Sequence, residues 1–540
     1  MDVFEEYIPH TNKFVKDYVE NGERAQSLFD YGQSSEDIKK RLYELSSRTY
    51  PKESLYKHLY KYNNKLKYNI GALRELDKLH NPDAVMMVTG QQAGILSGPF
   101  YTITKALTIL KEAEAKEEML GVPVLPVFWI AGEDHDWDEV NHIFLPNDDK
   151  PRKVTYKGEH DPGKPVSDQL LDEEAFERWW REVMTVLPET NHTTDVYHSL
   201  QQLAGKSLTM TDFFAEVMRW LFKDTGLIML DANHHDLRQM ETDMFLELIH
   251  ANNVVRDAVK QGIDNRKAFD YETPEGLSDK SAQLFYHYHQ KRQLLYKQSE
   301  NMYTDKTGNL SIHENDLIKQ ASSHPENLST NALTRPLIQE QLLPVLGYIA
   351  GPGEINYWSL LKPLFHRFGL YMPPLLPRME ITVVPRFVQS VMDKESLTVP
   401  QLLKSGAGSH IEQIRKHAKK VDGASMAEEL LQEIEPYHAN MQQEWGKIAP
   451  SERSYGETNW KIIQKEIYSF AEKIDNYQEN KEMDRVQRIK KAEQMLVPFN
   501  NPQERVYNMI FFLNKYGSTF VQDLKSLEIE RNGKHKYIKM

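Results

Sequence analysis

Four polar residues suited to acid–base or ligand chemistry follow an apolar run in the N-terminal half of the chain. The run ends at Gly132, and Glu133, Asp134, His135 and Asp136 come directly after it. Carboxylates can hold an amine or a metal ion, and carboxylates and imidazoles can act as acid and base. The alternative is a solvated loop in which Asp134 or Asp136 caps the next helix. We favour a functional site, because ligands bind beyond the carboxyl ends of strands in open α/β sheets.

A metal site has weaker support in these residues. His135 and His142 are seven residues apart, so a helix could place both on one face. Neither an HxxxH pattern nor a matching carboxylate pattern accompanies them, so we assign no metal ligand and leave the need for a metal open. A second polar group, from Asp231 to Asp236, follows the apolar run from Leu227 to Leu230. For Asn233 and Asp236, each considered alone, a helix cap is the better explanation.

Backbone amides could bind an anion at a third candidate site, a glycine-rich turn. The apolar run from Val85 to Val88 predicts a buried strand, and glycines at 90, 94 and 98 follow it before a helical pattern that includes Ile103. The uncovered amides of such a helix start can hold an anion. The spacing GQQAGILSG is neither the dinucleotide fingerprint nor a P-loop, so a purely structural crossover is equally compatible with it. The candidates in this turn are Thr89, Gly90 and Gln92 for substrate binding and Gln91 for catalysis.

The same order of strand, glycine turn and helix occurs again later in the chain. Val345 to Ile349 predicts a strand, and Gly351, Pro352 and Gly353 precede a helix. Two such turns in one parallel sheet can lie side by side at the switch point and face a common ligand. A role for Asn356 and Glu354 in capping the helix is an equally compatible alternative. The candidates here are Gly351, Gly353, Asn356 and Tyr357.

Composition excludes several classes of protein. The chain has 540 residues, and 66 Lys and Arg against 79 Asp and Glu give a net charge of -13, which disfavours nucleic acid as a partner. The absence of cysteine excludes disulfides, thiolate metal sites and a cysteine nucleophile. The start MDVFEEYIPH lacks a signal-peptide pattern, and no stretch approaches the ~18 apolar residues of a membrane span. We therefore expect a cytoplasmic protein that binds neither nucleic acid nor membranes.

The pattern of elements predicts an α/β fold with a Rossmann-like parallel-sheet core and an appended helical region. We expect the core in residues 1–388, with a helical lead-in and insertions at about 145–210 and 260–335. Residues 389–505 carry apolar residues at coiled-coil spacing on both sides of IAPSERSYG, which predicts an antiparallel helical hairpin. Residues 506–540 should pack back at the joint between the two regions. The apolar seam can pair the two helices or recruit a second subunit.

Residues around this joint form a candidate second site. Cationic and aromatic side chains suit an adenine and its phosphates. Ordinary surface and packing roles explain these residues better when each is considered alone. The candidates for this nucleotide site are Arg386, Lys490, Arg505, Tyr507 and Asn508.

Several motifs occur together over the whole length of the chain. They are VTGQQAGILSGPFYTITKA, FWIAGEDHDWDEVNH, YIAGPGEINYWSLLKPLF with PPLLPRMEIT, and the late NPQERVYN. In this combination the chain resembles the BshC family, the cysteine ligases of bacillithiol biosynthesis. The resemblance implies a Rossmann-like core related to class I aminoacyl-tRNA synthetases and a coiled-coil domain used for homodimerisation.

The resemblance also implies a reaction. L-cysteine would be joined through its carboxyl group to the amino group of glucosaminyl-malate. A free carboxylate and an amine do not condense in water without activation, so we expect ATP to convert the carboxylate into an acyl phosphate, with release of ADP, or into an acyl adenylate. In that reaction the two glycine turns would stabilise developing negative charge. Asp134 and Asp136 would bind an ammonium group, and His135 would take the proton of the attacking amine. Other roles fall to Tyr357 or Gln91 for the sugar, and to Lys105 or Arg378 for malate or phosphate.

Two other functions remain open at this point. The same sheet edge could serve a nucleotidyltransferase or hydrolase acting on another small metabolite. A non-enzymatic coiled-coil protein that binds a nucleotide as a structural or regulatory ligand is the other alternative. Ligand binding at the glycine turns would favour an enzyme, whereas binding only near Arg386 and Tyr507 would favour the adaptor.

Overall fold

The computed structural model describes residues 1–148, 150–274, 280–418 and 420–540. These residues form two compact units. Unit 1 contains Met1–Val383 and Gln503–Met540, and unit 2 contains Val384–Pro502. The last segment of the chain therefore belongs to the unit that also contains the N-terminus. Residues 149 and 275–279, which fall in the two predicted insertions, lie outside the described residues.

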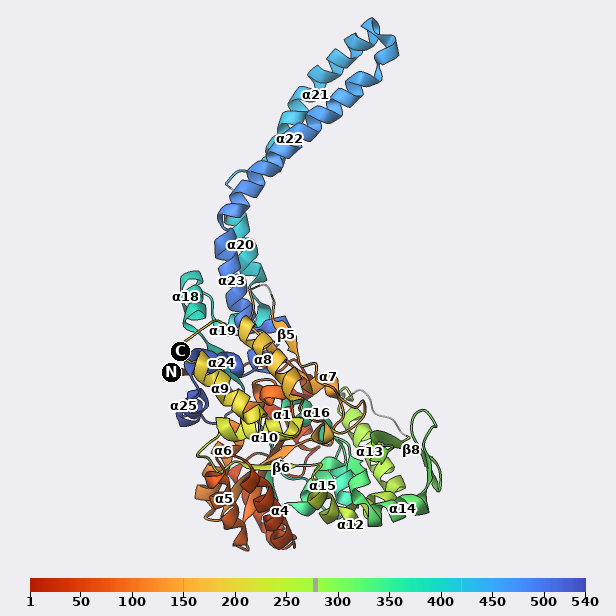
Figure 1. The fold of residues 1–540 in the computed structure, drawn as a ribbon. Coiled ribbons are helices and arrows are strands. Elements are labelled where there is room, and N and C mark those ends of the chain that lie inside the picture. The colour runs from red at the N-terminus through yellow and green to blue at the C-terminus, as the bar shows by residue number, and fades with distance from the viewer. Residues whose placement is uncertain (149, 275–279, 419) are drawn as a thin grey trace. The chain divides into compact units, whose positions relative to one another are not determined.

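A five-stranded parallel sheet lies in unit 1 (Figure 1). Counted along the chain, its strands lie in the order 3-2-1-4-5, which matches the Rossmann order 3-2-1-4-5-6 without its last strand. The prediction of a Rossmann-like parallel sheet is thus confirmed. The order reverses between the first and fourth strands, so the switch point lies between them. Across the sheet the strands are β6 (Ile228–Asp231), β3 (Val124–Ile130), β2 (Val85–Gln91), β12 (Val345–Ala350) and β13 (Leu375–Pro377).

The predicted strand, glycine turn and helix are present at β2. Its first six residues are buried, as expected of a strand covered on both faces. A short 3-10 turn, η2 (Ile95–Ser97), leads to α6 (Tyr101–Leu120). Gly98 has a φ of 68°, and a Cβ at Gly94 would lie 2.9 Å from the Cα of Gly98, so this turn requires glycine. A residue with a Cβ therefore could not replace either glycine unless the turn moved.

The N-terminal lead-in is helical, as predicted, except for its first residues. Strand β1 (Asp2–Glu6) pairs antiparallel with β15 (His535–Lys539), which also pairs with β14 (Ile381–Val384). Local periodicity could not predict β1, because its partner lies at the opposite end of the chain. The helices are α1 (Lys13–Val19), α2 (Glu23–Gln26), α3 (Ser35–Ser46), α4 (Lys52–Lys65) and α5 (Ile70–Asp77).

The segment after β3 adds a small hairpin and three longer helices. Its Trp179 and Trp180 are buried, so the region has an apolar core although prolines interrupt its sequence. The indole NH of Trp179 donates to the Val154 carbonyl, which fixes the hairpin to the first of these helices. The elements are α7 (Trp137–Val140), β4 (His142–Leu145), β5 (Arg152–Thr155), α8 (Glu173–Val186), α9 (Thr193–Ala204) and α10 (Met210–Leu221).

A second, antiparallel sheet lies between β6 and β12 in the sequence. Three helices precede it, namely α11 (His235–Met240), α12 (Thr242–His250) and α13 (Asn252–Lys267). In spatial order its strands are β10 (Ser311–His313), β9 (Met302–Thr304), β8 (Lys291–Ser299), β7 (Ser281–Tyr288) and β11 (Leu328–Thr330). The remaining helices of unit 1 are α14 (Glu314–Ser323), α15 (Arg335–Leu342), α16 (Pro352–Trp358), α17 (Lys362–Arg367), α24 (Ile510–Tyr516) and α25 (Phe520–Ser526).

Unit 2 is helical, and its two longest helices form the predicted antiparallel hairpin (Figure 1). The chain reverses at Pro450–Glu452, inside the stretch that predicted a reversal. The apolar residues at coiled-coil spacing include Ala427 and Tyr437 before the reversal and Phe470 after it, and only part of this predicted seam is buried. Ala427 and Ala471 are buried between the helices, whereas Tyr437 and Phe470 are 77% and 68% exposed. The helices are α18 (Arg386–Glu395), α19 (Val399–Ser405), α20 (Gly408–Ala418), α21 (Gly423–Ile448), α22 (Ser454–Lys481) and α23 (Met483–Leu496).

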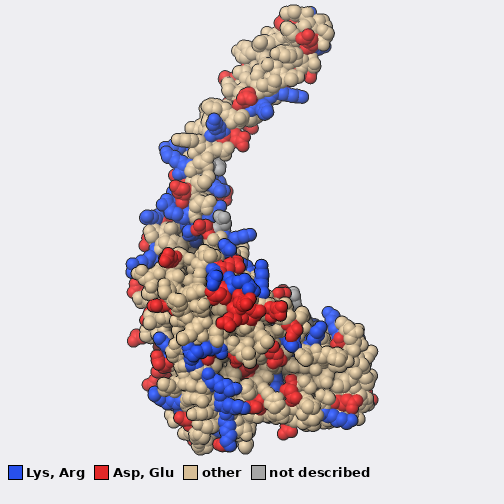
Figure 2. Space-filling model, viewed as in Figure 1, with Lys and Arg blue, Asp and Glu red and all other residues tan. Residues whose placement is uncertain are grey.

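The surface carries both signs of charge. Figure 2 shows acidic and basic side chains interspersed on the face in view, and mostly uncharged residues near the turn between α21 and α22. Among the described residues, no helix combines the length and the apolar character needed to cross a bilayer. A cytoplasmic location and the absence of a nucleic-acid partner stay predictions.

Candidate active site

The two glycine turns line one pocket at the carboxyl ends of β2 and β12. Its volume is about 320 Å³, which is within the range of small-ligand sites. The structure thus brings two turns more than 250 residues apart in sequence to a common pocket, as a switch point should. From the sequence-based candidates the pocket wall contains Gly90, Gln91, Gln92, Gly351, Gly353, Asp134 and Tyr357.

Lys105 of α6 connects the two turns. Its Nζ donates to the Gly90 carbonyl at 2.6 Å and to Gln91 Oε1 at 3.2 Å, and it lies 2.6 Å from Glu354 Oε2. The same Glu354 oxygen accepts the Gly351 backbone N–H at 2.7 Å, which caps α16. Burial lowers the pKa of Lys105, and the Glu354 carboxylate opposes that shift. An ion pair therefore holds both turns in one fixed arrangement.

Arg335, at the start of α15, holds the carboxylates that follow β3. Its Nε donates to Glu133 Oε1 at 2.8 Å and its Nη2 donates to Asp134 Oδ1 at 3.0 Å. Arg292 of β8 lies 3.3 Å from the same Asp134 oxygen. Burial would raise the pKa of Asp134, but the guanidinium groups of Arg335 and Arg292 outweigh it and lower the pKa. Asp134 is therefore a carboxylate at neutral pH.

Two more arginines extend the positive wall of the pocket. Arg378, after β13, lies 2.6 Å from Glu504 Oε1 and donates to Thr104 Oγ1 at 3.1 Å. Arg505 also lines the pocket but is exposed. Among the described residues it has no ion-pair partner, whereas Lys105, Arg335 and Arg378 each have one. Arg505 is thus the cation of this wall with a charge left for an anionic ligand.

Four of the candidates lie outside this wall. Thr89 is fully buried, and its hydroxyl donates to the Ile349 carbonyl at 2.9 Å, which ties β2 to β12. Asn356 accepts two bonds from Arg266, at its backbone oxygen (2.7 Å) and at Oδ1 (2.6 Å). Asp136 is exposed. Thr89 and Asn356 therefore hold neighbouring elements together, and Asp136 faces solvent.

His135 is the fourth of these candidates. Its Nδ1 lies 3.2 Å from Arg292 Nη1, which can only donate, so Nδ1 accepts and the neutral ring carries its proton on Nε2. Burial, with Arg292, lowers the pKa of His135. In this arrangement His135 orients Arg292, which in turn contacts Asp134. Its role as the base stays a prediction, because the pocket wall includes Asp134 but not His135.

The five candidates for a second nucleotide site are divided between the two units. Arg386 and Lys490 belong to unit 2, and the other three belong to unit 1. Asn508 donates through Nδ2 to the Leu96 carbonyl at 2.8 Å, and the Tyr507 carbonyl accepts from the Phe100 N–H at 2.9 Å. Both residues thus fix the glycine turn after β2, and Arg505 lines the pocket at the switch point. A shared nucleotide site stays a prediction.

Several wall residues were not singled out from the sequence. Arg335 is the most important, since it lies about 200 residues from the carboxylates that it binds. No spacing rule connects such residues, so only the adjacent proline and the start of a helix marked its position. The others are Tyr101, Trp129, Gln339 and Tyr348.

This arrangement suits a ligand that carries negative charge and an amine. The turn amides, Arg505 and the Nη1 of Arg335, which bonds to no other described residue, can bind carboxylate or phosphate oxygens. Asp134 offers the negative charge for an ammonium group. Phosphate groups of a nucleotide fit this chemistry, since the pocket wall contains four cations against the carboxylates of Asp134 and Glu354.

The fold and the pocket together define an α/β protein of the Rossmann-like class with a ligand site at the switch point and an attached helical hairpin. Comparison with known proteins agrees. The model of the N-terminal Rossmann-like domain of bacillithiol biosynthesis BshC matches residues 1–379, and that of the C-terminal coiled-coil domain matches residues 381–540. The chain therefore belongs to the BshC family.

Curated relatives match over nearly the whole chain. A protein of Oceanobacillus iheyensis is 34% identical over 94% of both chains. Proteins of Bacillus pumilus and Bacillus licheniformis are 33% and 34% identical over the full length of both chains. Each of the three carries the name "Putative cysteine ligase BshC". The resemblance predicted from the motifs is thus confirmed.

Proposed function

We propose that this protein is a carbon–nitrogen ligase that joins the carboxyl group of L-cysteine to the amino group of glucosaminyl-malate, giving bacillithiol. Full-length membership in the BshC family supports the reaction class. The observation that carries the proposal is the pocket at the switch point, where cations and Asp134 line one wall. A cysteine zwitterion has the complementary charges.

The contacts suggest how cysteine is oriented. Arg335 Nη1 makes no hydrogen bond with another described residue, so it is available to the cysteine carboxylate, while Asp134 attracts the ammonium group. In the reaction, the glucosamine nitrogen attacks the carboxyl carbon, a C–N bond forms, and the C–O bond to the leaving group breaks. The attacking nitrogen loses a proton to a base. ATP, when bound, would supply the leaving group, because a free carboxylate and an amine do not condense unaided in water.

A neighbouring pocket provides room for the second substrate. It has a volume of about 530 Å³ and shares Pro352 and Arg378 with the first pocket. Gln26 and Gln33 line it, and the buried atoms Gln26 Oε1 and Gln33 Nε2 lack a hydrogen-bond partner among the described residues. Buried amides without partners are suited to sugar hydroxyls. We assign glucosaminyl-malate to this pocket, with its amine directed at the switch point.

We also propose that the protein forms a homodimer through the hairpin of α21 and α22. Large apolar side chains are exposed on this hairpin. Tyr437, Met441 and Ile448 are 77%, 70% and 77% exposed. Clusters of this kind mark protein contact sites, and a second copy offers the same surface.

Purified full-length protein, L-cysteine, glucosaminyl-malate and ATP test the proposal. Mass spectrometry should detect bacillithiol, and omission of any one component should abolish it. Release of ADP or of AMP identifies the bond of ATP that breaks. If no bacillithiol forms while another amine or nucleotide is converted, the nucleotidyltransferase or hydrolase alternative is correct. If a nucleotide stabilises the fold but nothing is converted, the protein is a nucleotide-binding adaptor.

A further inference from the structure

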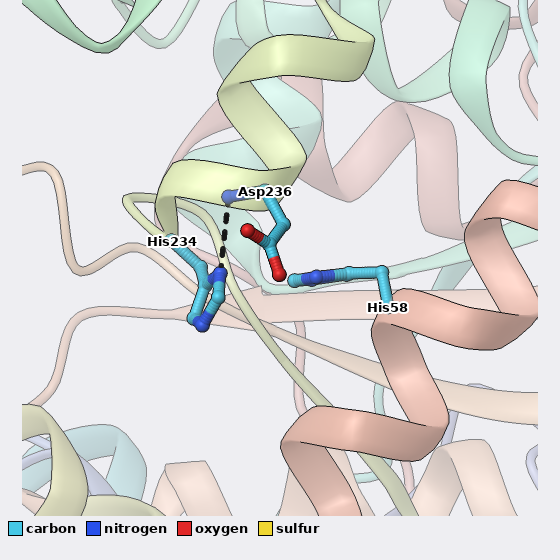
Figure 3. Close-up of side chains that lie close together, drawn as sticks. All are labelled: His58, His234 and Asp236. Atoms are coloured by element: carbon cyan, nitrogen blue, oxygen red, sulfur yellow. Dashed lines mark hydrogen bonds between the residues drawn. The ribbon is translucent and has the colours of Figure 1, made fainter.

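Three potential metal ligands lie together outside the proposed active site (Figure 3). His58 comes from α4, His234 lies just before α11, and Asp236 is in its first turn. One ligand atom from each lies within 4.8 Å of the others. Because β6 leads directly into His234 and α4 packs on β6, the fold itself creates this cluster.

His58 is the unusual member of the cluster. It is only 4% exposed, and neither of its ring nitrogens has a hydrogen-bond partner among the described residues. Buried polar groups nearly always have a partner, and an orphan pair on one imidazole requires an explanation such as a bound ion. Figure 3 shows the His58 ring directed at the Asp236 carboxylate. A neutral imidazole has one ring nitrogen that carries a lone pair, and this is the form that ligates a metal ion.

The other two members can also present lone pairs. His234 Nδ1 accepts the Asp236 backbone N–H at 3.2 Å, so this nitrogen carries no proton. A cation could bind this lone pair in place of the Asp236 N–H, whose hydrogen bond to Nδ1 is long. Asp236 Oδ2 is paired with Lys61 Nζ at 2.7 Å, but the Lys61 side chain is 59% exposed. An exposed ammonium group contributes little and can move into solvent.

We propose that His58, His234 and Asp236 bind a divalent transition-metal ion of the zinc class. Two imidazoles and one carboxylate suit Zn²⁺, whereas Mg²⁺ and Ca²⁺ prefer sites made of oxygens. Three protein ligands leave one position of a tetrahedral ion open to water or to another ligand. His234 also lines a pocket of about 600 Å³ at the end of β6, so that position is accessible from a cavity.

Zinc titration of the full-length protein tests this site. The protein is first stripped with a chelator, and Zn²⁺ binding is measured by calorimetry and by metal analysis after dialysis. We expect about one ion per chain and a rise in the unfolding temperature on zinc addition. Cobalt loading should give the visible absorption of a four-coordinate site. Binding of much less than one ion by the wild-type chain would overturn the proposal.

Variants locate the ion. His58→Ala and Asp236→Asn should each weaken zinc binding by about tenfold or more, because losing a ligand costs at least as much as losing a residue that only orients one. His198→Ala, which removes an exposed histidine of α9, should leave binding unchanged. Lys61→Ala should bind zinc more tightly, because it removes the cation that competes for Asp236. Equal affinity of the wild type, His58→Ala and Asp236→Asn would show that zinc binds elsewhere and would refute this site. Circular dichroism of each variant confirms that its fold is retained.

Discussion

The ammonium group of Lys105 lies 2.6 Å from Glu354 Oε2, so one ion pair joins the helix after β2 to the helix after β12. The side chains of the two residues are 4% and 16% exposed. This pair closes the switch point of the sheet and positions both glycine turns around the pocket. It is therefore important for stability as well as for the site.

The first prediction concerns this pair. Lys105→Met should lower the free energy of unfolding by about 3 kcal/mol, because it leaves a buried carboxylate without its cation. It should also lower kcat/KM by about a hundredfold, since the turns lose their connection. Urea unfolding and product formation measure the two effects.

The matched control is the double variant Lys105→Met with Glu354→Gln. Removing both charges should restore most of the stability but not the activity. If the single variant is as stable as the wild type, the ion pair does not contribute to the free energy of unfolding, contrary to what its burial implies. If the double variant regains activity, the charge of Lys105 is not needed at the site.

Substitutions of Gln91 and Asn356 should have different effects, although each residue lies next to a glycine turn. Gln91 ends β2 and Asn356 is in α16. Gln91→Ala should lower kcat/KM by about tenfold or more with little loss of stability, because its side chain lines the pocket. Asn356→Ala should cost about 1 to 3 kcal/mol of stability, since it removes an acceptor of Arg266, and should retain activity. Kinetics and chemical unfolding of the two variants decide the matter. Equal activity losses would place Asn356 in the site.

Arg505 should act on ligand binding. Arg505→Gln should raise KM for an anionic substrate by about tenfold and leave kcat less changed, because the exposed guanidinium has no ion-pair partner among the described residues. Its unfolding temperature should stay at the wild-type value. Arg505→Lys retains the charge and should recover part of the loss. An unchanged KM in Arg505→Gln would remove this residue from the binding wall.

A pH dependence of stability should arise from Asp231, at the end of β6. Burial raises the pKa of Asp231 to about 7, although the Ser167 hydroxyl and the Asn233 N–H donate to its carboxylate. A raised carboxyl pKa favours the protonated form in the folded state. Its stabilising contribution is therefore complete below the ordinary value of 3.8 and is lost as the pH rises through about 7.

Asp231→Asn should remove this dependence. The unfolding free energy of the variant minus that of the wild type should increase from about pH 4 to about pH 7 and then level off. Asp257→Asn, on an exposed position of α13, is the surface control. A difference curve for Asp231→Asn that is flat, or that falls with pH, would contradict the assignment.

The hairpin surface predicts an effect on assembly. Tyr437→Glu with Phe470→Glu should convert a dimer to a monomer in analytical ultracentrifugation, because it places charge in an apolar contact. Gln432→Glu, at an exposed polar position of α21, should remain dimeric. A wild-type protein that sediments as a monomer at all concentrations tested would end the proposal.

Local sequence patterns predicted much of the fold but only part of the site. The apolar runs gave β2, β3, β6 and β12, because a parallel strand buried on both faces needs a continuous apolar segment. The motif after β3 predicted the place of Asp134 but not the direction of each side chain. Asp134 faces the pocket, whereas His135 contacts Arg292 and Asp136 is exposed. The direction of each side chain depends on the turn after β3 and on its neighbours Arg292 and Arg335, which lie far away in the sequence.

The heptad pattern shows a similar division. It predicted two long helices with a reversal between them, since apolar spacing at 3.5 residues is a local property. It placed Ala427, Tyr437 and Phe470 in the seam between the helices. The structure buries Ala427, together with Ala471, but leaves Tyr437 and Phe470 exposed. Gly423 explains part of this, because a Cβ there would lie 2.5 Å from the Ala471 carbonyl oxygen. The helices therefore approach closely at small residues, where a larger side chain would not fit.

The sequence by itself determined the elements, the glycine turns, the absence of thiol chemistry and the family. These properties depend on residue type and on short spacings. Only the tertiary structure decided that Arg335 binds Asp134, that Arg505 joins the pocket wall, and that His58 meets His234. Such contacts depend on which strands and helices become neighbours, and that order arises from the packing of the whole chain.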